Sequence, residues 1–148
     1  MREWYAEERP VDDVVQFAVD DRRAHRMRST WDEQWLRLLD VDAALGARAF
    51  ADADGSFTVA VTDALLADNS GSWEISASGA KRIADGPADH GAADLAVTVT
   101  DLAAAYLGGT KWTALAGAGR IDVRDSRALA LADALFAVPW APFCCSGF

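Results

Sequence analysis

Residues 94–109 read DLAVTVTDLAAAYLGG and place a strand pattern directly before a helix pattern. Larger apolar residues alternate with smaller ones here, with Leu95, Val97 and Val99 on one side and Ala96 and Thr98 on the other. This alternation is typical of a strand with one buried face. Thr100 or Asp101 can then cap a helix over LAAAYL, which ends at Gly108 and Gly109. We therefore expect a domain that combines strands and helices.

The same alternation occurs in other stretches. It is found in WLRLL at 35–39, FTVAV at 57–61 and WEIS at 73–76, and AKRIA at 80–84 is a possible further strand. Strands of this kind are common in antiparallel and mixed sheets, because one face is buried and the other is less apolar. The sequence predicts a mostly antiparallel or mixed sheet of about five strands.

Helical patterns lie between and after these strands. Asp42 can cap AALGARAF at 43–50, and a short helix is expected after Pro10. The clearest helix is the last one, which ends before Pro139 and has apolar residues at i, i+3, i+4, i+7 and i+8: Ala128, Leu131, Ala132, Leu135 and Phe136. With most helices near the end of the chain, an α+β domain is predicted. His90, in the turn-rich segment 84–94, is interpreted as an exposed loop residue.

Composition and charge limit the partners. The chain has 148 residues, 51% of them hydrophobic, with 14 Lys and Arg against 23 Asp and Glu and a net charge of -9. One globular core is feasible, and the negative field disfavours nucleic acid and membrane surfaces. The basic stretch DDRRAHRMR at 20–28 is expected to be a solvated face or an interdomain contact. No apolar run is long enough to cross a bilayer and no leader pattern is found, so a cytoplasmic location is expected.

Cofactor and metal motifs are missing from the sequence. Gly117 and Gly119 lack the third glycine of a dinucleotide-binding loop, and Ala114 stands where an acetyl-CoA loop of the GNAT type has Gln or Arg. His25 and His90 are far apart and offer no metal-ligand spacing. No cofactor or metal site is therefore expected in this chain.

The cysteines and tryptophans could serve either in packing or in a functional site. The adjacent cysteines at 144–145 have no neighbouring cation to lower the thiol pKa, and they are interpreted as packing residues. Trp73 and Trp112 lie on apolar patterns and are predicted to be core residues. Trp35 and Trp140 adjoin polar or terminal residues and are candidates to line a cavity or an interface.

Several stretches together resemble the carboxy-terminal region of the Eis (enhanced intracellular survival) family of N-acetyltransferases. They are WLRLLDVDAALGAR at 35–48, NSGSWEI at 69–75, DLAVTVTDLAAAYLGGTKWTALAGAGRI at 94–121 and ALALADALFAVPWAPF at 128–143. The resemblance implies two GNAT-like domains followed by a domain like sterol carrier protein 2 (SCP2), whose sheet is covered on one face by helices. Because 9–24 resembles the end of the second GNAT-like domain, residues 1–30 are expected to be its remnant and 31–148 the SCP2-like domain. The first domain, which carries the acetyl-CoA loop in the family, has no counterpart in these residues.

The resemblance also implies a role for the apolar tail PWAPFCCSGF at 139–148. In the family, the α-carboxylate of a final aromatic residue enters the acetyltransferase site and takes part in proton transfer from the substrate amine. The matching residue is Phe148, and a rigid tail would be needed to position its carboxylate. On this view the chain is not catalytic alone, and the complete enzyme uses acetyl-CoA. GNAT-like domains, in the same protein or a separate chain, would be its partners, and homo-oligomers are possible.

Three residues are candidates for the acceptor-amine pocket on the same resemblance. They are Trp35, Asp40 and Trp140, with Asp40 offering negative charge to a cationic substrate such as an aminoglycoside. An aspartate just ahead of a helix is also a common cap, so this alternative stays open for Asp40. A stand-alone SCP2-like carrier of an apolar ligand and a purely structural or oligomerisation module are the alternative functions.

Overall fold

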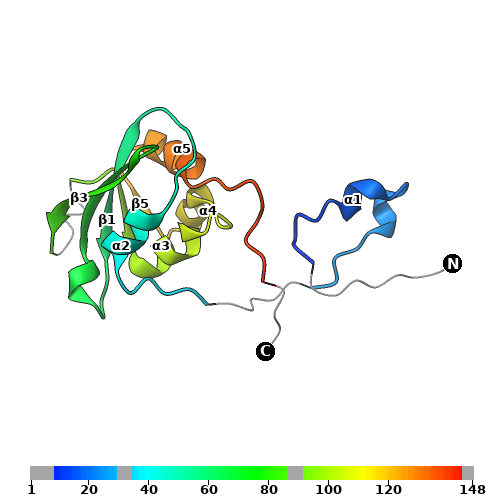
Figure 1. Cartoon of the computed structure of the whole chain (residues 1–148), viewed down its shortest axis with the longest axis horizontal. Coiled ribbons are helices and arrows are strands. Elements are labelled where there is room, and N and C mark those ends of the chain that lie inside the picture. Colours follow the sequence, from blue (N-terminus) through cyan, green and yellow to red (C-terminus); the bar gives the residue numbers. More distant parts are fainter. Residues whose placement is uncertain (1–8, 30–34, 87–91, 145–148) are drawn as a thin grey trace. The chain divides into compact units, whose positions relative to one another are not determined.

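A computed structural model describes residues 9–29, 35–86 and 92–144 of the chain (Figure 1). The chain divides into two compact units, one made of Met1–Trp35 with Pro139–Phe148 and the other of Leu36–Val138. Among the described residues of the first unit, the regular elements are helix α1, Val15–Ala18, and a 3₁₀ turn, Arg22–Ala24. The short helix expected after Pro10 is therefore present.

Within the described part of the second unit, five strands form one sheet in the order β3-β2-β1-β4-β5. Their bounds are β1 Ser56–Thr62, β2 Gly71–Ser76, β3 Gly79–Asp85, β4 Leu95–Thr98 and β5 Asp122–Val123. The pairs β1–β2, β2–β3 and β4–β5 are antiparallel, whereas β1 and β4 run parallel. This confirms the predicted α+β class and mixed sheet.

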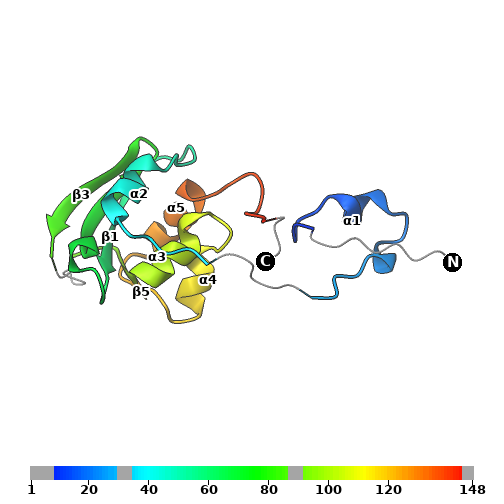
Figure 2. The same ribbon diagram turned by 60° about the horizontal axis from the view of Figure 1, so that its bottom comes forward.

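Four helices pack against one face of this sheet (Figures 1 and 2). They are α2 Val41–Ala47, α3 Val99–Tyr106, α4 Trp112–Gly117 and α5 Ser126–Leu135, and a 3₁₀ turn at Ala67–Asn69 precedes β2. The alternating residues Phe57, Val59 and Val61 of β1 join the helices in one core cluster. Trp73 and Trp112 are 0% and 1% exposed, which confirms both as core residues.

Segment 35–39 is a correction to the sequence-based expectation, because it is irregular and forms no strand of the described sheet. Leu38 alone is buried there, while Leu36 and Leu39 are exposed. A single inward side chain between outward neighbours reproduces a period of two over a few residues without any strand pairing.

Two helix caps also differ from expectation. Asp40, not Asp42, caps α2 by accepting a hydrogen bond from Ala43 N at 2.9 Å, and Asp42 instead accepts from Trp73 Nε1 at 3.0 Å. At α3 the cap is Thr98, whose Oγ1 accepts from Asp101 N at 3.2 Å. Both helices begin earlier than predicted because these side chains reach the free N–H groups of the first turn.

Candidate functional site

A pocket of about 590 Å³ lies in the second unit, where the parallel strands β1 and β4 end. In sheets with parallel strands, ligands commonly bind beyond the carboxyl ends of those strands. The charged residues that line this pocket are Arg37, Asp63, Asp101 and Arg120. Their pairing decides what chemistry the pocket can perform.

Asp63, directly after β1, is the more buried of the two carboxylates, with a side chain 1% exposed. Arg37 Nη2 donates to both of its oxygens, at 2.9 and 2.8 Å, and Asn69 Nδ2 donates to Oδ2 at 2.9 Å. Burial by itself raises the pKa of Asp63, but hydrogen bonds from Asn69, the Leu65 amide, Arg37 and the Leu66 amide outweigh it and hold the pKa well below its usual range. Asp63 therefore stays ionised at neutral pH.

Asp101 forms the second ion pair. Its Oδ1 accepts from Arg120 Nε at 2.5 Å, and its Oδ2 accepts from Thr98 Oγ1 at 2.6 Å. The Asp101 side chain is 4% exposed, whereas Arg120 is half exposed. Each carboxylate of the pocket is thus paired with one guanidinium, and these ion pairs link the loops around the pocket.

The described residues hold no group of three or more His, Cys, Asp or Glu side chains that could bind a metal ion. Among the same residues, no helix has the length and apolar character needed to span a membrane.

The predicted site residues fall in different places. Trp35 and Trp140 belong to the first unit and are 91% and 68% exposed. Asp40 belongs to the second unit, where it is exposed and caps α2. Phe148 lies outside the described residues, as does His90. Trp35 and Trp140 therefore share one unit, and Asp40 belongs to the other.

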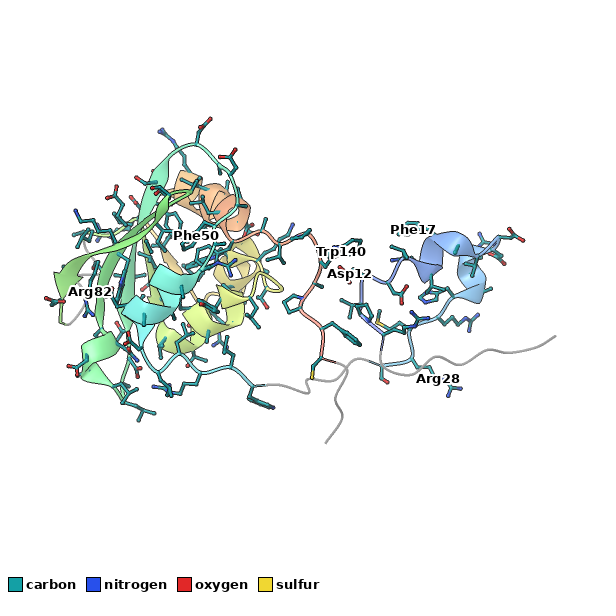
Figure 3. All side chains as sticks on the ribbon, viewed as in Figure 1. Asp12, Phe17, Arg28, Phe50, Arg82 and Trp140 are labelled. Carbon is teal, nitrogen blue, oxygen red and sulfur yellow. The ribbon has the colours of Figure 1, made fainter. Side chains whose placement is uncertain are left out.

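The tail contacts the amino-terminal segment within the first unit. The backbone N–H of Ala141 donates to Asp12 Oδ2 at 2.9 Å, although 129 positions separate the two residues (Figure 3). Phe143 is 47% exposed and Cys144 is half buried. This hydrogen bond thus joins the described segments 9–29 and 139–144.

Sequence reasoning missed the pocket's ion pairs and the role of Asp12. A signal existed for Arg37, which interrupts a run of leucines, and for Asp63, which follows a strand directly. The pairing itself could not be read, because 26 positions separate Arg37 from Asp63 and 19 separate Asp101 from Arg120.

The comparisons with known proteins agree with this fold. The family model described as "Sterol carrier protein domain" matches residues 41–145. The chain therefore belongs to the family of sterol carrier protein domains. More particularly, the relatives that it resembles are N-acetyltransferases, among them proteins named Eis.

Those relatives are longer proteins. An uncharacterized N-acetyltransferase of Streptomyces coelicolor is 44% identical over 144 residues, which cover 90% of this chain and 32% of that protein. The N-acetyltransferase Eis of Mycobacterium tuberculosis is 34% identical, covering 86% of this chain and 30% of its own length. The crystal structure of Eis1 from Mycobacterium abscessus matches with a TM-score of 0.83 and 37% identity, covering 95% of this chain and 34% of that one. The chain thus spans about a third of the length of these relatives.

Proposed function

We propose that this chain is the SCP2-like module of an acetyl-CoA-dependent N-acetyltransferase, and that the α-carboxylate of Phe148 completes an active site carried by GNAT-like domains. The observation that carries the proposal is the match to N-acetyltransferases over about nine tenths of the chain, at up to 44% identity. The resemblance extends through the tail as far as Phe143. In this role the carboxylate accepts the proton that the acceptor amine loses when its nitrogen attacks the acetyl thioester.

The partner in this proposal is the remaining two thirds of the relatives' length, which would supply the acetyl-CoA site. The carboxylates of the described pocket are each paired with an arginine, which favours a structural role for them. The first unit offers a better docking surface, since several of its apolar side chains are exposed. They are Val11, Val14, Phe17, Met27, Trp140 and Phe143. Exposed apolar side chains favour association with another domain or a second copy.

A cationic amine, such as an aminoglycoside, is the acceptor class that fits. The net charge of -9 attracts polycations. Exposed indole rings at Trp35 and Trp140 would suit a cationic ligand by contact with the ring faces. Asp40, which caps α2 in the other unit, is a separate candidate to bind a cationic group.

The carrier alternative is less favoured because aromatic rings occupy the space between the sheet and the helices. Trp112 lies edge-on to Phe57 and Phe136, with ring centroids 5.8 and 5.0 Å apart, and Phe50 lies 5.3 Å from Phe136. An apolar ligand in this part of the core would have to displace them.

The test is a chimera in which this chain replaces the corresponding third of the Streptomyces coelicolor relative. Acetyl transfer to an aminoglycoside is followed by release of the coenzyme A thiol. Deleting Phe148 is expected to lower kcat by about 100-fold or more, since a positioned general base contributes on that order.

Two further variants separate the carboxylate from the ring. Phe148→Ala keeps a terminal carboxylate at the same backbone position and should retain most of the activity. One glycine added after Phe148 keeps the ring but displaces the carboxylate by about 3.5 Å, and it should be as damaging as the deletion. Equal kcat in the parent, the deletion and the extension would refute the catalytic tail.

A further inference from the structure

The hydrogen bond between Asp12 and Ala141 ties the described tail, 139–144, to the segment before α1. The tail has no helix or strand in this range, so no backbone ladder fixes its direction. Pro139 and Pro142 cannot donate a hydrogen bond, because proline lacks an N–H group. Ala141 is one of the four residues of 139–144 that have a backbone N–H, and this N–H donates to Asp12.

Hydrogen bonds of the neighbouring residues fix the backbone around Asp12, whose carboxylate is the acceptor. Asp13 N donates to the carbonyl of Pro10 at 3.1 Å, which closes a turn with Val11 and Asp12 at its centre. Asp13 Oδ1 accepts from Val15 N at 2.8 Å, and its other oxygen pairs with Arg9 at 2.9 Å. The turn is thereby joined to the start of α1, while the carboxylate of Asp12 itself accepts from Ala141 N.

A carboxylate that accepts from a backbone amide makes a stronger bond than a neutral acceptor does. Asp12 and Ala141 are both half buried, which limits competition from water. The prolines on either side of the bond restrict the neighbouring backbone, because each fixes its own φ angle. One such bond can therefore limit the directions open to the tail between Pro139 and Pro142.

We propose that Asp12 is a positioning residue, whose carboxylate holds the Ala141 amide and so aims the carboxy-terminal tail at the acetyltransferase site. The catalytic part of this inference rests on the proposed role of Phe148. The statement that Asp12 anchors the tail does not rest on that role, because the hydrogen bond lies within this chain. Asp12 also belongs to the stretch that resembles the end of the second GNAT-like domain, so the bond would couple that domain to the tail.

The first experiment measures amide hydrogen exchange at Ala141 by NMR in the 148-residue chain. Asp12→Ala should accelerate exchange at this amide by about 10- to 100-fold, the range expected for a lost hydrogen bond to a charged group. Asp12→Asn keeps one acceptor oxygen and should restore part of the protection. Asp20→Ala removes the same charge from an exposed position of the same unit and should leave Ala141 unchanged. Core amides of the second unit report any general loss of structure.

The second experiment places the same substitutions in the chimera. Asp12→Ala should lower kcat by about 10- to 100-fold while the KM for acetyl-CoA stays unchanged, because misplacement of a catalytic group affects the chemical step. Asp12→Asn should be intermediate and Asp20→Ala should match the parent.

The outcomes separate the two proposals. If Ala141 exchanges equally fast in the parent chain and in Asp12→Ala, the positioning role of Asp12 is wrong. If protection is lost but kcat is unchanged while deletion of Phe148 still lowers it, the tail is catalytic but Asp12 does not aim it. If deletion of Phe148 has no effect, the catalytic proposal fails, and exchange at Ala141 still decides whether Asp12 anchors the tail.

Discussion

Asp63 connects three parts of the second unit through its carboxylate. It binds Arg37 before α2, the Leu65 and Leu66 amides after β1, and the Asn69 side chain. Asn69 in turn accepts from Val41 N at 3.0 Å, the first residue of α2. A buried carboxylate with this many donors stabilises the fold only while it is ionised, so its energetic contribution depends on pH.

The hydrogen bonds hold the pKa of Asp63 below its value in the unfolded chain, so the unfolded state binds the proton more readily. The contribution of Asp63 is fully present at neutral pH and is lost as pH falls below about 5. Asp63→Asn should lower the free energy of unfolding at pH 7 by about 2 to 4 kcal/mol, because Arg37 loses its buried partner. It should also flatten the fall in stability between about pH 5 and pH 2, measured by urea unfolding at several pH values.

Asp54→Asn is the matched control for this substitution. Asp54 is exposed and carries the same charge, so its loss should change stability by less than about 0.5 kcal/mol. A pH profile in Asp63→Asn parallel to that of the parent would show that other carboxylates cause the acid sensitivity.

At the scale of elements, the carboxyl ends of α3 and α5 meet at one place. Arg48 donates to the carbonyls of Tyr106 and Phe136, at the ends of these two helices, and its guanidinium lies 4.6 Å from the centre of the Phe136 ring. Gly108, just after α3, has a φ of 80°, and a Cβ added there would lie 2.5 Å from the Phe136 carbonyl. The two helices can approach this closely only because residue 108 has no side chain.

Gly108→Ala should therefore destabilise the second unit by about 2 to 4 kcal/mol, which combines a strained backbone with a steric clash. The measurement is the urea midpoint followed by far-UV circular dichroism. Gly117→Ala is the control, since an added Cβ at the end of α4 meets nothing within 4 Å. That change should be neutral or stabilising by about 0.5 kcal/mol, because alanine is the better helix former. Equal losses from both substitutions would contradict this account of Gly108.

At the scale of the whole molecule, the buried apolar residues among those described all lie between Leu38 and Phe136. They belong to the second unit, Leu36–Val138, whereas the described apolar residues of the first unit include many that are exposed. The hydrophobic contribution to stability is roughly proportional to buried apolar area, so the second unit holds nearly all of it.

A chain shortened to residues 36–138 should therefore unfold cooperatively, with a free energy of unfolding within about 1 kcal/mol of the full chain. Trp73 and Trp112 are the two tryptophans in this range, and both are buried. Their fluorescence reports core unfolding without a contribution from exposed indoles. A shortened chain that is unfolded, or whose urea midpoint falls strongly, would mean that the first unit contributes to the core.

Local patterns in the sequence were sufficient for the class of fold and for most elements. The strands β1, β2 and β4 follow from alternation, and α5 follows from apolar spacing before Pro139, because these signals depend on neighbours a few positions apart. The same reasoning failed at 35–39, where one buried leucine imitated a strand. It also missed β5, which has only two residues, Asp122 and Val123.

Only the tertiary structure decided which distant residues meet. Periodicity indicates that a side chain turns inward or outward, but it does not identify a distant partner. The partners here are 26 positions apart for Arg37 and Asp63, 88 for Arg48 and Phe136, and 129 for Ala141 and Asp12. These contacts arise from how the sheet, the helices and the chain ends pack, which no short window of sequence contains. The sequence alone therefore determined that this protein is an α+β domain with an apolar tail. The tertiary structure decided which carboxylates pair with arginines and which one accepts a hydrogen bond from the tail.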